Sequence, residues 1–581
     1  MTAPNRNALW ARALVDELAR GGVDAVCVAP GSRSTPLSVA VAEHADVRAF
    51  SHLDERSAAY FALGRARRTG DPTPLVSTSG TAAANFHPAV VEASQARVPM
   101  LLLTADRPPE LRDSGANQTI DQEKLYGDAV RWYRDVAEPE ADARKLRSLR
   151  TTVARALAEA TGTPAGPVHL NLPFRKPLEP TPVEGDVPPD LDPLAAAGRG
   201  DDPFVRAEGG TPTLDEDRVR ALAEAFAVDR GLLVAGPADP PGLDADALTA
   251  LAHATGFPVL ADPLSGLRFG GHGRVTTVVG GYDGFLDPAV TADWPDPEVV
   301  VRVGASPTSK PLRKYLARVD ARQFVVDPAG GWREAEFAAT DLVVADPSRL
   351  AGRVARLVAT APAASWIDRW TDAEATHWAA VDAVEESFEG RVLADVADLA
   401  PEPSTIFVSN SMPVRDLDRF ARPSTSALTA LGNRGASGID GIVSTALGAG
   451  SATTDDLTLV VGDLAYYHDM NGLLALDRCE VDATVVLIDN DGGGIFHALP
   501  IEEFDPPFTG WFKTPHGLDF SPTGDLYGLD FRRVDPDDFR EAYADAVAAD
   551  GSQVLAASFD AEASHRTRER LKARVVDDLG E

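Results

Sequence analysis

The sequence predicts an α/β protein with three domains, each built on a doubly wound parallel sheet. The chain has 581 residues, which is too long for a single hydrophobic core. Short runs of Val, Ile and Leu alternate with helix-like segments from one end to the other. Continuous apolar strands separated by helices are typical of parallel sheets that are covered on both faces. Two interruptions divide this alternation into three parts of similar size.

The chain is expected to open with an amphipathic helix within residues 1–20, MTAPNRNALWARALVDELAR, and thirteen strands follow in three groups. The first group covers residues 23–29, 73–78, 99–105 and 166–173. The second covers residues 230–236, 257–262, 298–304, 322–327 and 341–346. The third covers residues 405–410, 457–463, 483–490 and 552–559.

Two breaks between these groups mark the expected domain boundaries. The segment 179–212 is rich in Pro, Gly and Asp and is expected to be an exposed linker, and a softer break lies near 360–370. We therefore expect an N-terminal domain in 1–180, a central Rossmann-like domain in 181–365 that begins with the linker, and a C-terminal domain in 366–581. Ligands gather at the carboxyl ends of strands in such sheets, so the residues that follow the strands are candidates for a site.

The composition restricts the classes of protein that fit. The chain carries 88 Asp and Glu against 55 Lys and Arg, a net charge of −33, and the acids are spread along its length. Such a surface stays soluble where salt screens its self-repulsion, so we expect a halophilic protein of a salt-rich cytoplasm. Nucleic-acid binding is disfavoured because phosphate requires a basic surface. No apolar run is long enough to span a bilayer, the first residues do not resemble a signal peptide, and two cysteines cannot form a disulfide framework.

Two of the predicted strands end in oxygen-bearing side chains that suit a cation. Asp463 follows the apolar run 457–462, Asn490 follows 483–489, and the two are 27 residues apart (490 − 463). That separation is the length of one strand–helix–strand crossover, which would bring both side chains to the ends of adjacent parallel strands. With a backbone carbonyl from Gly492, these hard oxygen ligands suit Mg²⁺ bound together with a diphosphate. The alternative is that both segments are ordinary turns that close strands.

The combination of Gly-Asp, some 26 intervening residues and an Asn followed by glycines resembles the motif of thiamin-diphosphate-dependent enzymes. The expected three-domain α/β layout resembles that enzyme type as well. The resemblance implies that Asp463, Asn490 and the Gly492 carbonyl hold the Mg²⁺ or Mn²⁺ that binds the cofactor's diphosphate. It also requires a glutamate from the N-terminal domain to contact the aminopyrimidine ring.

Glu55, in the segment HLDERSAAYFALGRAR at 52–67, is expected to be that glutamate. It lies at the start of a helical stretch, and its small neighbours Ala58, Ala59 and Ala62 allow close packing and partial desolvation of its carboxyl group. The resemblance implies that its hydrogen bond to the ring nitrogen N1′ activates the cofactor. The alternative is that Glu55 only stabilises a helix N-terminus by charge–dipole attraction.

The sequence is most similar to one branch of this enzyme type, the 2-succinyl-5-enolpyruvyl-6-hydroxy-3-cyclohexene-1-carboxylate synthases of menaquinone biosynthesis. The similarity is carried by APGSRSTPL (29–37), HLDER (52–56), STSGTAAANFHPAVVEA (77–93), LLLTADRPPELRDSGANQTI (101–120), SNSMPVRD (409–416), NRGASGIDGIVSTALG (433–448) and GGGIF (492–496). These stretches span nearly all of the first and third expected domains, and the middle one matches only around GASPTSK (304–310). Members of this branch join 2-oxoglutarate to isochorismate with loss of CO₂.

The resemblance implies a site that binds several carboxylates, because both substrates carry them. Arginine suits this task because its planar guanidinium binds a carboxylate through two hydrogen bonds, although a single arginine is more often a surface ion pair. The implied substrate residues are Ser32, Arg33, Arg107, Asn117, Gln118, Lys310, Arg415, Arg434, Ile495 and Phe496. The further cofactor contacts implied are Ser411, Gly438 and Ile439, the last as the apolar residue over which the cofactor bends. Lys310 is followed by Pro311, so a second cation at that point would have to come from Arg313.

Two alternatives stay open. Another thiamin enzyme, such as an acetolactate-synthase-like carboligase or a 2-oxo-acid decarboxylase, would share Glu55, Asp463 and Asn490 but would not need the arginines. A non-catalytic nucleotide-binding protein would need a G-x-G-x-x-G turn after a strand, and no convincing one is found. The resemblance also implies a homodimer or a dimer of dimers, because the family's cofactor lies between the first domain of one subunit and the third domain of another.

We predict that the fold requires salt. At about 0.01 M ionic strength the Debye length grows to roughly 30 Å, so repulsion among the dispersed acids reaches across a domain. The urea midpoint of unfolding should therefore fall continuously as KCl is reduced from molar concentration. The same titration near pH 4, where many carboxylates are protonated, should show a smaller dependence. A midpoint at pH 7 that does not change with KCl would contradict the prediction.

Overall fold

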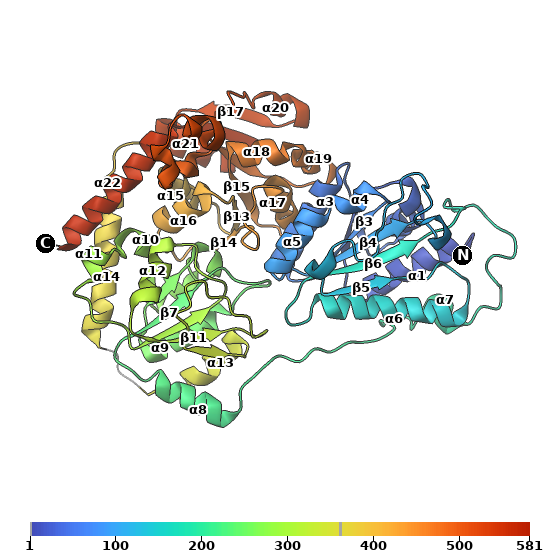
Figure 1. The fold of residues 1–581 in the computed structure, drawn as a ribbon, viewed down its shortest axis with the longest axis horizontal. Helices are drawn as coiled ribbons and strands as arrows, with labels where there is room; N and C mark the ends of the chain where they lie inside the picture. The colour runs from blue at the N-terminus through green and yellow to red at the C-terminus, as the bar shows by residue number, and fades with distance from the viewer. Residues whose placement is uncertain (1–2, 360–362, 581) are drawn as a thin grey trace. The chain divides into compact units, whose positions relative to one another are not determined.

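The computed structural model describes residues 3–359 and 363–580, so residues 360–362 of the predicted second break lie outside the described residues. The described chain contains three six-stranded sheets, labelled in Figure 1. Every pairing between neighbouring strands is parallel. The predicted α/β class with three parallel sheets is therefore confirmed.

The strands follow the chain in three blocks of six. The first sheet is formed by β1 (Ala25–Val28), β2 (Arg48–Ser51), β3 (Thr73–Ser77), β4 (Met100–Asp106), β5 (Trp132–Asp135) and β6 (Pro167–Pro173). The second is formed by β7 (Gly231–Ala235), β8 (Val259–Ala261), β9 (Val278–Val279), β10 (Val299–Val303), β11 (Arg322–Val326) and β12 (Asp341–Val343). The third is formed by β13 (Ser404–Val408), β14 (Leu428–Leu431), β15 (Asp456–Gly462), β16 (Thr484–Asp489), β17 (Asp530–Val534) and β18 (Gln553–Ser558).

The α-helices are interleaved with these strands. Those of the first block are α1 (Arg6–Arg20), α2 (Thr35–Glu43), α3 (Glu55–Thr69), α4 (Thr81–Ala84), α5 (His87–Gln95), α6 (Ala143–Ala160) and α7 (Pro193–Ala197). Those of the second are α8 (Glu216–Ala225), α9 (Ala245–Thr255), α10 (Tyr282–Phe285), α11 (Pro288–Thr291), α12 (Lys310–Arg318) and α13 (Pro347–Ala355). Those of the third are α14 (Ala364–Asp382), α15 (Glu389–Leu399), α16 (Met412–Phe420), α17 (Ile442–Gly450), α18 (Asp463–Asp469), α19 (Ala475–Arg478), α20 (Pro522–Tyr527), α21 (Phe539–Val547) and α22 (Ala561–Gly580). Within the described ranges, no helix combines the length and the apolar character that a membrane crossing needs.

The first and third sheets have the same strand order. The first runs β2-β1-β3-β4-β6-β5 and the third runs β14-β13-β15-β16-β18-β17. Counted from the first strand of each block, both read 2-1-3-4-6-5, whereas the middle sheet, β12-β11-β10-β7-β8-β9, reads 6-5-4-1-2-3. In all three sheets the strand order reverses. In open α/β sheets, ligands bind at the carboxyl ends of the strands near such a reversal.

Helices cover both faces of the first sheet (Figure 1). On one face Trp10 of α1 and Leu149 of α6 share a buried cluster with Val26 and Val28 of β1. On the other face α3 contacts β1, β3 and α5. Side chains alternate along a strand, so Cys27, which lies between the two valines, points to this second face. The helix α1 matches the amphipathic helix that the first residues predict.

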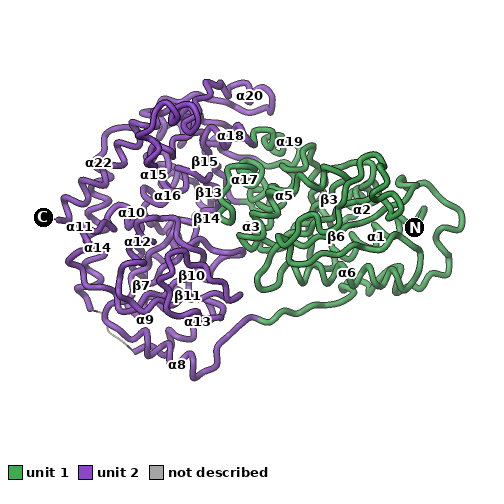
Figure 2. The backbone as a smooth tube through the Cα atoms, viewed as in Figure 1, with its two compact units in different colours: residues 1–210, 433–454, 469–481 green, residues 211–432, 455–468, 482–581 purple. Residues whose placement is uncertain are grey.

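The chain forms two compact units, which Figure 2 shows in different colours. Unit 1 contains residues 1–210, 433–454 and 469–481, and unit 2 contains residues 211–432, 455–468 and 482–581. Unit 1 thus holds the first sheet together with α17 and α19. Unit 2 holds the second and third sheets.

Within unit 1, α3 and α17 pack closely because glycines lie where they meet. A Cβ on Gly64 of α3 would lie 1.9 Å from a backbone carbonyl oxygen of α17, and a Cβ on Gly448 of α17 would lie 2.0 Å from one of α3. The three alanines expected to allow close packing, Ala58, Ala59 and Ala62, are fully buried. This packing fixes the course of α3, whose first residue is Glu55.

Most residues of the segment 179–212 are exposed, as expected of a linker, but parts of it are bound to the first sheet's helices within unit 1. The Asn5 amide donates a hydrogen bond to the Glu179 carbonyl oxygen, and the buried Arg150 guanidinium donates to two carbonyl oxygens of α7. Further along, Phe204 is buried and its backbone N–H donates to the Glu17 carboxylate. Proline, glycine and aspartate therefore mark an exposed segment here that is anchored to unit 1 at a few points.

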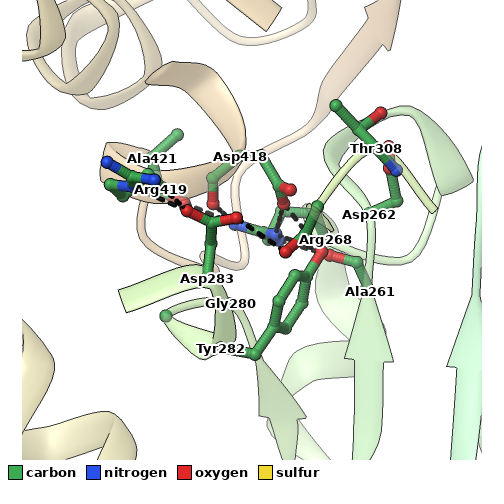
Figure 3. Close-up of polar contacts among 12 residues, drawn as sticks. Ala261, Asp262, Arg268, Gly280, Tyr282, Asp283, Thr308, Asp418, Arg419 and Ala421 are labelled. Carbon is green, nitrogen blue, oxygen red and sulfur yellow. Dashed lines mark hydrogen bonds and ion pairs between the residues drawn. The ribbon is translucent and has the colours of Figure 1, made fainter. Parts of the chain in front are cut away.

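A buried polar cluster joins the second and third sheets inside unit 2 (Figure 3). Arg268 is 1% exposed, and its Nε donates to the Ala261 carbonyl oxygen at 2.7 Å. Its Nη1 donates to the carbonyl oxygens of Asp418 and Ala421, both at 3.0 Å. Its Nη2 donates to the Tyr282 hydroxyl at 3.1 Å and to Asp418 Oδ1 at 2.7 Å. All five guanidinium N–H groups thus have partners, which is the condition for burying this cation.

All thirteen predicted strands are present, and their ends differ from the prediction by at most three residues. The five strands that the sequence analysis missed, β2, β5, β9, β14 and β17, all lie at sheet edges. Some of these edge strands carry charged residues, such as Arg532 and Arg533 in β17, whereas β9 (VV) and β14 (LTAL) are short. Their apolar runs are therefore too short or too interrupted to indicate a buried parallel strand.

We predict that Arg268→Ala lowers the free energy of unfolding by ~3–5 kcal/mol, because it leaves the buried Asp418 carboxylate without its cation. Arg570→Ala is the control and should cost at most about 1 kcal/mol, because an exposed ion pair contributes little. The Arg570 side chain is 59% exposed and pairs with Glu386 at 3.1 Å. Urea unfolding of both variants in molar KCl measures the difference. Equal losses in the two variants would contradict a structural role for the buried cluster.

Candidate cofactor and substrate site

Asp463 lies at the carboxyl end of β15, where it is the first residue of α18. It is 2% exposed. Its Oδ2 accepts hydrogen bonds from the backbone N–H groups of Asn490 at 3.1 Å and Gly492 at 2.9 Å. The strands β15 and β16 are adjacent and parallel, with Gly462 opposite Ile488. The crossover expected from the 27-residue spacing therefore does bring Asp463 and Asn490 together.

The side-chain amide of Asn490 is held by a buried ionic cluster. Its Nδ2 donates to Glu389 Oε1 at 2.7 Å, and Glu389 pairs with Arg568, which also pairs with Asp416. These three charged side chains are at most 4% exposed. An ion-paired carboxylate accepts from the amide nitrogen and not from its oxygen, so Asn490 Oδ1 must face the other way. That oxygen is buried and has no hydrogen-bond partner in the described part of the chain, as expected of an atom that binds a cation.

The loop at residues 490–494, named here the glycine loop, needs glycine at Gly492. The backbone there has φ +131°, and an added Cβ would lie 2.0 Å from the Lys513 carbonyl oxygen. The neighbouring Gly493 donates its N–H to the same carbonyl at 2.7 Å. The glycine loop is therefore held against the π-helical turn Thr509–Lys513. Glycine also lets the main chain approach a ligand closely.

Two groups beside Asp463 received no role from the sequence. Asp463, Asp489 and His516 each offer a ligand atom, and these atoms lie within 4.8 Å of one another. Burial raises the pKa of Asp489, and the nearby Asp463 carboxylate adds to the shift.

Asp491 accepts the backbone N–H groups of His516 at 2.9 Å and Gly517 at 2.7 Å. Asp491 therefore anchors a turn.

In unit 1, predicted substrate residues follow β1, beginning with Ser32 and Arg33 in a short 3-10 turn. Arg33 is 5% exposed, and its Nη1 donates to the Phe174 carbonyl oxygen at 2.6 Å. Its Nε is buried and has no hydrogen-bond partner among the residues described. The adjacent Ser32 is exposed. A buried N–H without a partner costs free energy, so a ligand oxygen would stabilise this position.

A second group of predicted substrate residues follows β4 in the same unit. Arg107 Nη2 donates to the Asn117 carbonyl oxygen at 2.7 Å, and its Nε is buried without a hydrogen-bond partner in the described ranges. Gln118 has a left-handed backbone with φ 53°. Its Nε2 donates to the Ser79 carbonyl oxygen at 3.0 Å, and the Ser79 hydroxyl donates back to the Gln118 carbonyl at 3.0 Å. The structure thus brings Arg107, Asn117 and Gln118 to the ends of β3 and β4.

Glu55 is the first residue of α3 and follows β2 in unit 1. The helix end is already capped by its neighbour, because Asp54 Oδ1 accepts the Ser57 N–H at 3.1 Å. Asp54 Oδ2 also accepts a hydrogen bond from the Asn471 amide at 2.6 Å. Asp54 therefore supplies the hydrogen-bonding cap, and Glu55 lies in the first turn, where a negative charge also favours the helix N-terminus.

The loop that carries Arg434, Gly438 and Ile439 is held in unit 1 by Glu92 of α5. Glu92 is 3% exposed. Its carboxylate accepts, at 2.8, 2.6 and 3.3 Å, the backbone N–H groups of Gly435, Ala436 and Ser437. Three consecutive N–H groups around one carboxylate fix the course of the loop. Sequence reasoning missed Glu92 because it lies in an ordinary helix far from this loop in the chain.

The remaining predicted residues lie in unit 2. Ser411 has φ 71° and directly precedes α16, and its carbonyl oxygen accepts a hydrogen bond from Arg415. Ile495 and Phe496 follow the glycine loop, and the Phe496 ring packs edge-on against Phe512 with centroids 5.5 Å apart.

Lys310 is the first residue of α12 in the second sheet's part of unit 2 and is exposed. Arg313, considered as the second cation of this segment, lies 3.7 Å from Glu336 and forms an ion pair with it. The Glu336 carboxylate thus partly neutralises the charge of Arg313.

Comparisons with known proteins agree with this geometry. Residues 10–125 match the family model described as the thiamine pyrophosphate enzyme, N-terminal TPP binding domain. The chain is 64% identical to a 2-succinyl-5-enolpyruvyl-6-hydroxy-3-cyclohexene-1-carboxylate synthase of Halorubrum lacusprofundi, over 99% of this chain and 98% of that protein. It is 64% identical to the synthase of the same name from Haloarcula marismortui over 100% of both chains. It is 50% identical to that of Roseiflexus castenholzii over 96% of this chain and 97% of that protein.

A solved structure supports the fold. The thiamine diphosphate-dependent 4-hydroxybenzoylformate decarboxylase of Rhodococcus jostii RHA1 superposes with a TM-score of 0.71 at 18% identity, over 95% of this chain and 99% of that chain. At this identity the likeness concerns the fold alone, and it confirms the predicted arrangement of a thiamin-diphosphate enzyme. The similarity to the synthases extends over the whole length at far higher identity. The chain therefore belongs to the family of 2-succinyl-5-enolpyruvyl-6-hydroxy-3-cyclohexene-1-carboxylate synthases, which confirms the family and the thiamin diphosphate cofactor predicted from its sequence.

Proposed function

We propose that the chain decarboxylates 2-oxoglutarate on thiamin diphosphate and adds the succinyl unit to isochorismate. The product is 2-succinyl-5-enolpyruvyl-6-hydroxy-3-cyclohexene-1-carboxylate, an intermediate of menaquinone (vitamin K2) biosynthesis. The observation that carries this proposal is the 64% identity, over nearly the whole chain, to synthases named for this product. The geometry that supports it is the pair of oxygen donors at the ends of β15 and β16. They are the Asp463 carboxylate and the buried amide oxygen of Asn490, which lacks a hydrogen-bond partner among the described residues.

Asp463, Asn490 and the Gly492 carbonyl group would hold a Mg²⁺ or Mn²⁺ ion against the cofactor's diphosphate. All three donors are oxygens, which are the ligands that such hard cations prefer. Glu389 supports this role because its bond to Asn490 Nδ2 keeps the amide oxygen free for a cation. Outer partners of this kind orient metal ligands in many proteins.

Thiamin diphosphate, when bound, supplies the nucleophilic carbon that attacks the keto group and the electron sink that stabilises the carbanion left by CO₂. Glu55 would hold a proton against the ring nitrogen of the aminopyrimidine and exchange it during turnover. One C–C bond breaks as CO₂ leaves and one forms to isochorismate, so the reaction needs no external oxidant or reductant.

The substrates set an electrostatic requirement on the site. Both are polyanions, whereas the chain carries a net charge of −33. Local cations must therefore offset the field of the protein where the substrates bind. The proposed cations are Arg33, Arg107, Lys310, Arg415 and Arg434. The proposed neutral contacts to the substrates and the cofactor are Ser32, Asn117, Gln118, Ser411, Gly438, Ile439, Ile495 and Phe496.

The unsatisfied Nε groups of Arg33 and Arg107 support their part in carboxylate binding. Each Nε is buried and has no hydrogen-bond partner in the part of the chain that the structure describes. A carboxylate oxygen placed there would satisfy a charged donor, and charge-assisted hydrogen bonds of this kind are strong. A 2-oxo-acid decarboxylase or another carboligase would share Glu55, Asp463 and Asn490 but would not need these arginines.

The proposed active form is a homodimer or a dimer of dimers. Each cofactor would be shared by two subunits, between the first domain (1–180) of one and the third domain (366–581) of the other. The central domain would comprise residues 181–365. The proposed location is a salt-rich cytoplasm, which suits the dispersed acidic surface.

Reconstitution tests the proposed reaction. The protein in molar KCl, supplied with 2-oxoglutarate and isochorismate, should release CO₂ and form one product whose mass is that of both substrates less CO₂. Product should form only when thiamin diphosphate and Mg²⁺ are both present. Pyruvate in place of 2-oxoglutarate is the control for the arginines, since it lacks the second carboxylate. Release of CO₂ at the same rate without isochorismate, or equal kcat/KM with pyruvate, would favour the alternative enzymes.

We predict that Glu55→Gln binds thiamin diphosphate with nearly normal affinity but loses about 10²–10⁴-fold in kcat, because the amide cannot exchange the proton. Tryptophan fluorescence measures cofactor binding, and product formation measures turnover. Glu480→Gln is a matched control in unit 1, because its side chain is 84% exposed and forms its ion pair with Arg48 at the surface. Turnover of Glu55→Gln close to that of Glu480→Gln would rule out the assignment.

A further inference from the structure

His516 connects the glycine loop to Asp463. Its Nε2 lies 3.2 Å from Asp463 Oδ2, and its backbone N–H donates to Asp491 Oδ1 at 2.9 Å. The imidazole is 12% exposed and packs edge-on against Phe520, with ring centroids 5.7 Å apart. The ring is thus fixed from three sides and aimed at the carboxylate.

The hydrogen bonds of His516 decide which ring nitrogen carries the proton. The Leu518 N–H donates to His516 Nδ1 at 3.0 Å, so Nδ1 is the acceptor of this ring. In a neutral imidazole with an acceptor at Nδ1, the hydrogen is on Nε2. Nε2 therefore donates a hydrogen bond to Asp463 Oδ2 and has no lone pair to offer a metal ion.

This donation leaves Asp463 with one saturated and one available oxygen. Oδ2 accepts three hydrogen bonds, from the Asn490 N–H, the Gly492 N–H and His516 Nε2. Oδ1 accepts the N–H of Leu464 at 2.6 Å, and the Asp463 carboxylate also shares a side-chain hydrogen bond with Asp489. An ionised carboxylate has about four lone-pair sites, two on each oxygen. The three contacts already exceed the two lone-pair sites of Oδ2, so Oδ1 is the oxygen through which a cation would bind.

The closeness of Asp463, Asp489 and His516 also admits a different arrangement, in which the three side chains ligate a cation by themselves. That arrangement requires a lone pair on Nε2, which the Leu518 bond to Nδ1 denies to the neutral ring. It would also leave the buried Asn490 Oδ1 without any role. An arrangement in which His516 Nε2 donates to Asp463 Oδ2 is consistent with the Leu518 bond to Nδ1 and leaves Asn490 Oδ1 as a ligand.

We propose that His516 is a positioning residue, which holds Oδ2 of Asp463 so that Oδ1, together with Oδ1 of Asn490, faces the cation of the cofactor. This inference rests on the proposed function, because it takes Asp463 and Asn490 as the ligands of that cation. It adds a residue from the segment after the turn Thr509–Lys513, which the sequence motif of the site does not include. The cation itself does not contact His516.

The test measures cation affinity directly. Mn²⁺ is titrated in the presence of thiamin diphosphate, and free Mn²⁺ is followed by electron paramagnetic resonance in molar KCl. His516→Ala should weaken Mn²⁺ binding by about 10–100-fold, as is typical when a partner of a metal ligand is removed. His516→Gln should recover most of the affinity, because its amide N–H₂ can donate to Oδ2. His253→Ala, on the exposed side of α9, is the matched control and should bind normally.

Asp463→Ala separates this inference from the proposed function. If Asp463→Ala loses Mn²⁺ binding and His516→Ala does not, the inference is overturned and the proposed function stands. If Asp463→Ala binds Mn²⁺ normally, the proposed function itself fails. The spectrum of the wild-type holoenzyme adds a test that needs no variant to fold. Coupling to a directly bound imidazole nitrogen would overturn the inference, because His516 would then be a ligand, whereas the proposal expects none. Thermal unfolding of each variant identifies any that is simply unfolded.

Discussion

The proposed cofactor-binding edge of the third sheet depends on the hydrogen bonds that Asp463 accepts. An ionised carboxylate at 2% exposure is costly unless it is well compensated, and here three N–H groups converge on its Oδ2. Two of them belong to the glycine loop and one to His516, so a single side chain fixes the end of β15, the loop after β16 and a segment near residue 516. The same bonds leave Oδ1 for a cation. The hydrogen bonds of Asp463 therefore both hold the loops at this edge and leave an oxygen for the proposed cation.

The first and third sheets have the same topology but carry different kinds of polar residue after equivalent strands. Both have the strand order 2-1-3-4-6-5, and in both the polar residues of interest follow the first, third and fourth strands. In the first sheet these positions carry Arg33, Ser79 and Arg107, and Glu55 follows the second strand. In the third sheet they carry Ser411, Asp463 and Asn490. The first sheet thus offers cations suited to carboxylate substrates, and the third offers oxygens suited to a metal ion.

Buried carboxylates recur as organisers of loops in this molecule. Glu92 gathers three backbone N–H groups of the loop that carries Arg434, and Glu389 orients Asn490 from within an ion-paired cluster. In each case a charge that never meets solvent holds a polar loop in one conformation. The acidic residues are therefore not confined to the surface, because some of them are buried and hold loops through hydrogen bonds.

Sequence reasoning found the interior of each sheet and the pair Asp463 and Asn490, because both follow local rules. Buried parallel strands are continuous apolar runs, and one crossover sets the spacing of residues on adjacent strands. It missed five of the six edge strands, whose apolar runs are short or interrupted by charge. It also missed His516, Glu389 and Glu92, since each acts through a contact between distant segments. His516 lies 26 residues beyond Asn490 (516 − 490), in a stretch with no strand or motif of its own. Such contacts come from the tertiary fold, and no periodicity in the sequence encodes them.

The most direct test of this account is a crystal structure of the holoenzyme with thiamin diphosphate and Mg²⁺ at a resolution that separates the two oxygens of Asp463. We expect one six-coordinate ion about 2.0–2.1 Å from Asp463 Oδ1 and Asn490 Oδ1, with His516 Nε2 still hydrogen-bonded to Oδ2. An ion bound by Oδ2 and His516, or one placed away from Asn490, would contradict it.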